Sequence, residues 1–181
     1  MIQDVVKDYK NQIEKAKKNV ELLYGQPTIY HDYDDNDNLA SSIVVEADKD
    51  RIAQVMYNLL SNAIKFSERN GGMNIKINKN ANDHNTNQEV IISVKDNGEG
   101  IHPEIIPRLF TKFATKSFDG TGLGLYISKG IIEAHGQRIW AENNIDLRHN
   151  GGKKGATFYF TLPLATNKTQ SANRNQKGSS C

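Results

Sequence analysis

Apolar residues along this chain recur with two spacings, one typical of helices and one typical of strands. Between residues 49 and 66 the apolar positions recur every three or four residues, the repeat of a single helix face. They are Ile52, Val55, Met56, Leu59, Leu60 and Ala63. Asp48 precedes them and is a good N-cap residue, while Gly71 and Gly72 follow. The pattern predicts a helix over 49–66 with one buried face.

Two more segments show helical spacing. Residues 123–135 are expected to form a second long helix. Ile2, Val6, Tyr9, Ile13 and Ala16 lie on one face of an opening helix. Two interpretations of that helix stay open, because two heptads are too few to decide. It packs on its own domain, or it continues an upstream coiled coil or dimerisation helix.

The remaining apolar runs are short and are bounded by polar or glycine-rich stretches, which is typical of strands. Strands are expected at 20–24, 43–46, 74–78, 89–95, 138–142 and 157–162. Residues 32–42 and the connection 79–88 are polar and predict surface loops. The mixture predicts an α+β two-layer sandwich with a mostly antiparallel mixed sheet on helices.

The chain is expected to have three parts. Residues 1–18 would form an N-terminal helix or linker, residues 19–164 the main domain and residues 165–181 a tail. The tail lacks apolar periodicity, so we expect it to be disordered.

Composition narrows the class of protein. The net charge of the 181 residues is +2, too small to indicate binding to nucleic acid or to an anionic membrane. The single cysteine, Cys181, excludes an internal disulfide framework and a cysteine zinc site. No apolar run approaches the roughly 18–20 residues of a membrane span, and the N-terminus does not resemble a signal peptide. We expect a cytoplasmic chain without direct membrane contact, tethered to a membrane only through upstream sequence if at all.

A polar stripe follows the predicted helix 49–66. Asn58, Asn62 and Lys65 are spaced by four and three residues, so they share one face beside the apolar one. An amide oxygen is a suitable ligand for Mg²⁺, and a lysine supplies a positive charge to phosphate. The stripe is therefore either a metal and phosphate site or simply a solvated polar face.

A short glycine-containing segment, 96–101, directly follows the predicted strand 89–95. Gly98 and Gly100 permit positive φ and a close approach of the backbone to a ligand. The carboxylate of Asp96 can accept a hydrogen bond from an exocyclic amine such as that of adenine. The alternative is an ordinary turn that ends a strand, because Asp-Asn-Gly is favourable turn chemistry.

A second glycine-rich segment, 120–125, opens the predicted helix 123–135. Free N–H groups and the helix dipole at such a position favour an anion. The preceding residues, 113–119, have little to pack and predict a mobile lid. The alternative is a tight loop that leads into a helix. The chain contains no P-loop, no G-x-G-x-x-G dinucleotide motif and none of the Ser/Thr/Tyr kinase motifs.

Five segments in this order resemble the N, G1, F, G2 and G3 boxes of the catalytic domains of sensor histidine kinases, within the GHKL ATPase superfamily. They are NLLSNAIKF, DNGEGI, LFTKF, GTGLGLYISK and KGATFYFTLP. The likeness extends over roughly residues 1–164. It implies that residues 1–18 lead toward a missing dimerisation domain and that residues 19–164 form a histidine-kinase-like ATPase domain. It implies a Bergerat-type ATP-binding sandwich with a flexible lid, and ATP and Mg²⁺ as ligands.

The resemblance assigns roles residue by residue. Asn62 would bind Mg²⁺, with Asn58 beside the phosphates and Lys65 on a phosphate, and these last two would be the catalytic residues. Phe66 would flank the purine and Asp96 would bind the adenine amine. The remaining nucleotide-binding residues would be Gly98, Gly100, Ile101, Phe113, Lys116, Gly120, Thr121, Gly122, Leu123, Gly124, Leu125 and Thr157. Phe110 and Phe113 would anchor the lid.

The chain departs from the family pattern at several positions. The lid is short, and an arginine frequent after the second phenylalanine of the F box is replaced, so Lys112 or Lys116 would take its place. Ala156 stands where a hydroxyl residue is frequent, with Thr157 following. None of the five histidines has the context of the family's phosphoacceptor.

Four functions remain open on these grounds. The first is a catalytic domain that donates phosphate from Mg-ATP to a histidine of a dimerisation domain, in cis upstream or in trans, with a response regulator as the further partner. The second is a GHKL ATPase of the gyrase, Hsp90 or MutL type, which is disfavoured because Asn58 cannot act as a carboxylate base. The third is a serine kinase of the anti-sigma type, and the fourth is an ATP-sensing adaptor or a degenerate fragment without kinase activity.

Overall fold

A computed structural model describes residues 2, 5–8, 19–24, 43–67, 72–80, 89–115, 120–146 and 152–165 of the chain. The predictions for the polar loop 32–42, for most of the connection 79–88, for lid residues 116–119 and for nearly all of the tail lie outside the described residues.

A five-stranded sheet forms one layer, with strand order β1-β2-β3-β5-β4. The strands are β1 (Asn19–Tyr24), β2 (Gly72–Asn80), β3 (Glu89–Lys95), β4 (Ile139–Asp146) and β5 (Gly152–Pro163). Only the pair β1–β2 is parallel, and the three other pairs are antiparallel. The sheet is thus mixed and mostly antiparallel, as predicted.

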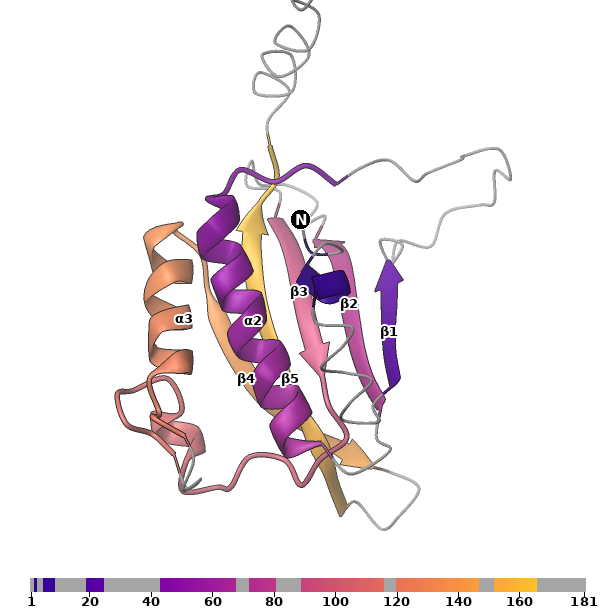
Figure 1. Ribbon diagram of the computed structural model, residues 1–181, viewed down its shortest axis with the longest axis vertical. Coiled ribbons are helices and arrows are strands. Elements are labelled where there is room, and N and C mark those ends of the chain that lie inside the picture. The colour runs from indigo at the N-terminus through magenta and orange to yellow at the C-terminus, as the bar shows by residue number, and fades with distance from the viewer. Residues whose placement is uncertain are drawn as a thin grey trace, which may run out of the picture.

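Two long helices form the other layer on one face of this sheet (Figure 1). They are α2 (Lys49–Phe66) and α3 (Gly124–Ala134), with a short 3₁₀ helix, η1 (Ile106–Arg108), between them in sequence. Helix α2 contacts β3, while α3 contacts β4, β5 and α2. The expected two-layer α+β sandwich is confirmed.

The core lies between the layers, and the predicted face of α2 fills it. All six apolar residues of that face are at most 2% exposed. Alternate residues of β3 and β5, including Ile92, Val94 and Phe160, bury their side chains against it. Val5, within the helical residues 5–8, is also buried in this core, so the described part of the N-terminal helix packs on its own domain.

Some boundaries differ from the sequence prediction. The expected strand at 43–46 is only an isolated bridge between Val45 and Leu164, flanked by hydrogen bonds from Glu46 N to Pro163 O and from Ala165 N to Val44 O. Strand β5 begins at Gly152, well before the predicted residue 157, and β4 runs on to Asp146. Their ends pair through the backbone, which leaves no hydrophobic pattern to recognise.

Candidate nucleotide site

The side chain of Asp48 fixes the start of α2. It accepts hydrogen bonds from the backbone N–H groups of Asp50 and Arg51, both at 3.0 Å. The bond from Arg51 is the main reason why the pKa of Asp48 lies below its ordinary value. The backbone N–H of Asp48 in turn donates to Nε2 of His135, just beyond α3, at 3.0 Å. The predicted cap is confirmed, and it ties α2 to the end of α3.

Asn58 connects α2 to the beginning of α3. Its Nδ2 donates to the carbonyl oxygen of Gly124 at 3.2 Å and to Oγ of Ser128 at 3.1 Å. Ser128 is fully buried. The structure thus brings the first polar residue of the stripe next to the glycine-rich segment 120–125. An added Cβ at Gly124 would lie 3.5 Å from the Asn58 amide, which shows how closely the two elements approach.

The rest of the stripe continues toward the C-terminal end of α2. Asn62 is half-buried, and no residue in the described part of the chain forms a hydrogen bond with its amide. Lys65 is exposed, with its ammonium nitrogen 5.7 Å from the centroid of the Phe66 ring. Phe66 itself is 52% exposed, which is unusual for so large an apolar ring. An available amide, a cation and an exposed ring therefore lie along one turn of helix.

Asp96 is the buried acid of the site. It is only 4% exposed, and Oδ1 accepts hydrogen bonds from the backbone N–H groups of Gly98 at 2.9 Å and Ala156 at 3.1 Å. Burial raises the pKa of its carboxyl, while these two bonds lower it in part. Within the described residues no donor reaches Oδ2. One carboxylate oxygen is therefore fixed by the protein and the other remains for a ligand.

Gly98 brings the segment 96–101 against the end of α2. A Cβ at this position would overlap the carbonyl oxygen of Phe66, so only glycine allows the two to meet. Gly100 has φ of +81°, and Ile101 is held by the side chain of Asn143. Helix α2 thus contacts the 96–101 segment at its end and the 120–125 segment near its middle. The polar stripe and the two glycine-containing segments, which the sequence predicted as parts of one site, therefore meet along α2.

The beginning of α3 is suited to an anion. The N-cap residue Leu123 makes no capping hydrogen bond with its side chain, and its own N–H donates to Oγ1 of Thr121 at 3.4 Å. The N–H groups of the first helical turn after it therefore have no side-chain acceptor among the described residues. Gly122 has φ of +67°, and its carbonyl oxygen accepts a bond from the Phe113 N–H at 3.1 Å. Thr121 is exposed, whereas Gly120, Leu123 and Leu125 are half-buried around this turn.

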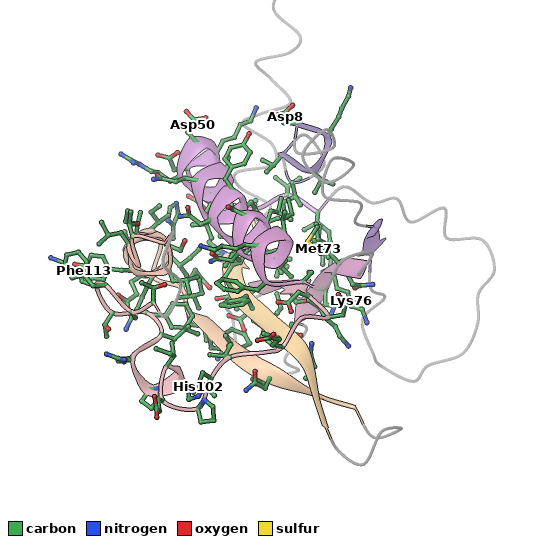
Figure 2. The ribbon with its side chains drawn as sticks, turned by 60° about the horizontal axis from the view of Figure 1, so that its bottom comes forward. Asp8, Asp50, Met73, Lys76, His102 and Phe113 are labelled. Carbon is green, nitrogen blue, oxygen red and sulfur yellow. The ribbon has the colours of Figure 1, made fainter. Side chains whose placement is uncertain are left out.

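The two phenylalanines expected to anchor the lid behave differently. Phe110 is half-buried and packs against the core. Phe113 is 70% exposed and has φ of +62°, and Figure 2 shows it at the outer edge of the molecule. The backbone of Phe113, and not its ring, contacts Gly122, and the anchoring role of this residue stays a prediction. Lys116 lies outside the described residues, and the ammonium of Lys112 lies 5.1 Å from the Tyr126 ring centroid.

The side chain of Thr157 does not point to the same side as the other proposed nucleotide-binding residues. It follows Ala156, which faces the core, and successive residues of a strand point to opposite faces. Its hydroxyl donates to Oδ1 of Asn144 at 2.6 Å. Thr157 therefore acts on the site indirectly, through its hydrogen bond to Asn144.

Four further residues lie around the site that were not predicted from the sequence, namely Ser128, Asn143, Asn144 and Gly155. Gly155 has φ of +86°, and a Cβ there would overlap the Asp96 carbonyl oxygen. The two asparagines stand in a strand, where asparagine is uncommon, and this was the only signal in the sequence that pointed to them.

Comparison with known proteins decides the family. Residues 47–166 match the model of the histidine kinase-, DNA gyrase B- and HSP90-like ATPases. This chain belongs to that family.

Its relatives define the branch of the family. Among them is the sensor histidine kinase WalK of Bacillus subtilis, 39% identical over 128 residues that make up 67% of this chain and 19% of WalK. Another is the sensor protein FixL of Bradyrhizobium diazoefficiens, 38% identical over 67% of this chain and 22% of FixL. The chain thus spans about a fifth of the length of these relatives.

Solved structures agree. The catalytic domain of histidine kinase ThkA is 32% identical, with a TM-score of 0.66, over 90% of this chain and 89% of that domain. A complex of ThkA with the response regulator TrrA matches with 31% identity and a TM-score of 0.62, over 91% of this chain and 39% of that chain. The domain is thus a histidine-kinase-type ATPase domain of two-component systems. Among its described residues no helix combines the length and apolar character needed to cross a membrane.

Proposed function

We propose that this ATPase domain binds Mg-ATP and donates the γ-phosphoryl group to a histidine on a dimerisation domain, as one step of a two-component phosphorelay. The observation that carries the proposal is the arrangement along α2. Its end contacts the segment with the buried Asp96, and Asn58 contacts the uncapped start of α3. Asn58, Asn62 and Phe66 are successive positions four residues apart, so they span roughly 12 Å of helix.

This arrangement suits a ligand with a base at one end and phosphates at the other. Asp96 Oδ2 would accept the adenine amine, and the exposed Phe66 ring would cover one face of the purine. The N–H groups at the start of α3 and the charge of Lys65 would hold phosphate oxygens. Asn62 would hold Mg²⁺, which neutralises charge on the phosphates when bound.

The residues near the phosphates favour transfer over hydrolysis. Asn58 is a neutral amide whose nitrogen is engaged with Gly124 and Ser128. It has no carboxylate with which to activate water. Phosphoryl transfer instead depends on positioning and charge stabilisation, which these residues supply.

The partners follow from this chemistry. The acceptor histidine would come from a dimerisation domain, in cis or in trans, and the phosphoryl group would pass on to a response regulator. The solved complex of the similar kinase ThkA with the response regulator TrrA supports a response regulator as the partner. We place the domain, residues 19–164, in the cytoplasm where ATP is available, with any membrane attachment through other sequence.

Calorimetric titration with ATP tests the binding step. We expect micromolar to sub-millimolar affinity that depends on Mg²⁺. In the Asn62→Ala variant the dependence on Mg²⁺ should be lost, whereas Ser61→Ala, an exposed neighbour on α2, should behave like the wild type. No binding at millimolar Mg-ATP would refute the proposal.

Transfer is tested with radiolabelled γ-phosphate and the dimerisation domain of the cognate kinase, supplied in trans. The wild type should label the acceptor with an acid-labile phosphate, and Asn62→Ala should not. Binding of ATP without any transfer would favour the ATP-sensing adaptor instead.

A further inference from the structure

Two consecutive asparagines of β4 hold the two ends of the segment that carries Asp96. The segment leaves β3 at Asp96 and ends at Ile101, with Gly98 and Gly100 between them. Glycines make such a segment easy to deform. One bond within it, from the Gly98 N–H to Oδ1 of Asp96, contributes to its shape, and groups outside it hold its two ends.

Asn144 holds the beginning of the segment. Its Nδ2 donates to the backbone oxygen of Asp96 at 3.0 Å. Its Oδ1 accepts the hydroxyl of the buried Thr157 at 2.6 Å, which fixes the orientation of the amide. Without that hydroxyl the amide could rotate and present its oxygen to the Asp96 carbonyl.

Asn143 holds the other end. Its Oδ1 accepts from the backbone N–H of Ile101, and its Nδ2 donates to the backbone oxygen of Ile101 at 2.9 Å. An amide side chain offers one donor and one acceptor side by side, so it can pair with a single residue as a neighbouring strand would. Aspartate in this position would lose the donor.

The sheet is irregular where the two asparagines stand. Successive residues of a regular strand point to opposite faces. Here the register between β4 and β5 shifts between Asn143 and Ile145. Asn143 pairs with Ala156, which faces the core, whereas Asn144 bonds to the hydroxyl of Thr157. The two adjacent asparagines therefore contact the segment from different sides, next to this shift in register.

We propose that Asn143 and Asn144 are positioning residues for recognition of the base, with Thr157 orienting Asn144. They fix the backbone at Asp96 itself and at Ile101, the two ends of the segment, so that Oδ2 meets the exocyclic amine of adenine. The proposal rests on the proposed function and assigns to that site three residues that determine base specificity without touching the nucleotide.

The readout is the ratio of the dissociation constants for ITP and ATP, measured with Mg²⁺ by calorimetry on the full chain. ITP carries an oxygen where ATP carries the amine, so the ratio reports the contact with Asp96 and not the phosphates. In Asn143→Ala and Thr157→Val the ratio should fall by about three- to tenfold, the scale of one weakened hydrogen bond. Thr157→Ser, which keeps the hydroxyl, should restore it.

Thr161→Val is the matched control. Thr161 is also buried on β5, and its hydroxyl likewise donates to an amide oxygen, that of Gln137 at 2.6 Å. It is four residues further along the strand, away from Asp96. The hydroxyl of Thr161 also accepts from the Arg138 N–H at 3.2 Å. Thr161→Val should therefore lower the melting temperature at least as much as Thr157→Val and leave the ITP to ATP ratio unchanged.

The outcomes separate this inference from the function on which it rests. A wild-type chain that does not bind ATP, or does not prefer it to ITP, overturns the proposed adenine contact. A wild-type preference that persists in both Asn143→Ala and Thr157→Val overturns the positioning role alone. If Asn143→Ala does not fold, Thr157→Val with its serine counterpart decides.

Discussion

The amide of Asn58 donates a hydrogen bond to the hydroxyl of Ser128 at 3.1 Å, and this bond crosses from α2 to α3. Ser128 is a fully buried polar residue in a mostly apolar helix. A buried hydroxyl requires a partner, and Asn58 supplies it. The same asparagine thus has a structural role in addition to the role proposed beside the phosphates.

Asn58 and Asn62 should therefore differ in their effect on stability. Asn58→Ala removes the bonds to Gly124 and Ser128, and we expect a loss of about 1–3 kcal/mol in the free energy of unfolding. Asn62→Ala should cost less than about 1 kcal/mol, because no described residue bonds to that amide. Urea denaturation of the two variants without nucleotide measures the difference, and equal losses would contradict it.

Asp96→Asn should weaken ATP binding while the ligand-free domain stays folded. The amide can keep an oxygen toward the N–H groups of Gly98 and Ala156, but it presents a donor where the carboxylate has Oδ2. We expect a loss of about 1–3 kcal/mol in binding free energy, the scale of a charged hydrogen bond. Calorimetry measures it, and an unchanged affinity would show that adenine binds elsewhere.

The difference in stability between the wild type and Asp96→Asn should change with pH in a definite direction. Burial raises the pKa of Asp96 above its ordinary 3.8, so the folded state binds its proton more tightly than the unfolded state. The resulting stabilisation is full below pH 3.8 and is lost as the pH rises through the raised pKa. The amide in the variant does not titrate and so loses no such stabilisation. Asp96→Asn should therefore become more stable relative to the wild type as the pH rises from acid to neutral. Denaturation curves from about pH 4 to about pH 7 test the trend, and a gain that shrinks with rising pH would contradict it.

Replacing either of two glycines by alanine should change the stability of the domain, in opposite directions. Gly98→Ala places a Cβ on the Phe66 carbonyl, and we expect a loss of about 2–4 kcal/mol in stability together with weaker ATP binding. Gly130 lies inside α3, and an added Cβ there would meet no other atom within 4 Å. Gly130→Ala should add about 0.5–1 kcal/mol. Thermal melts of both variants give the comparison, and a tolerated Gly98→Ala would place the end of α2 away from Asp96.

The order of amino acids was sufficient to predict the elements with strong periodicity and the motifs within them. The bounds of α2 and the capping role of Asp48 came from the apolar repeat and one polar residue before it. Both depend on neighbours in the chain, so a linear pattern carries them. The resemblance of five ordered segments likewise identified the family, because the spacing of Asn58, Asn62 and Lys65 on one helix can be read directly from the sequence.

The folded arrangement established which side chains are committed to the protein and which remain for a ligand. Nothing in the sequence indicates that Asn58 bonds across to Ser128, or that Thr157 points to Asn144 while Ala156 holds Asp96. These facts depend on strand pairing and on a register shift between β4 and β5. Partners 60 or more residues apart, such as Asp96 and Ala156 or Asn58 and Ser128, meet only when the sheet and its helices assemble. Local patterns do not encode such contacts, because the long-range pairing that creates them is a property of the whole fold.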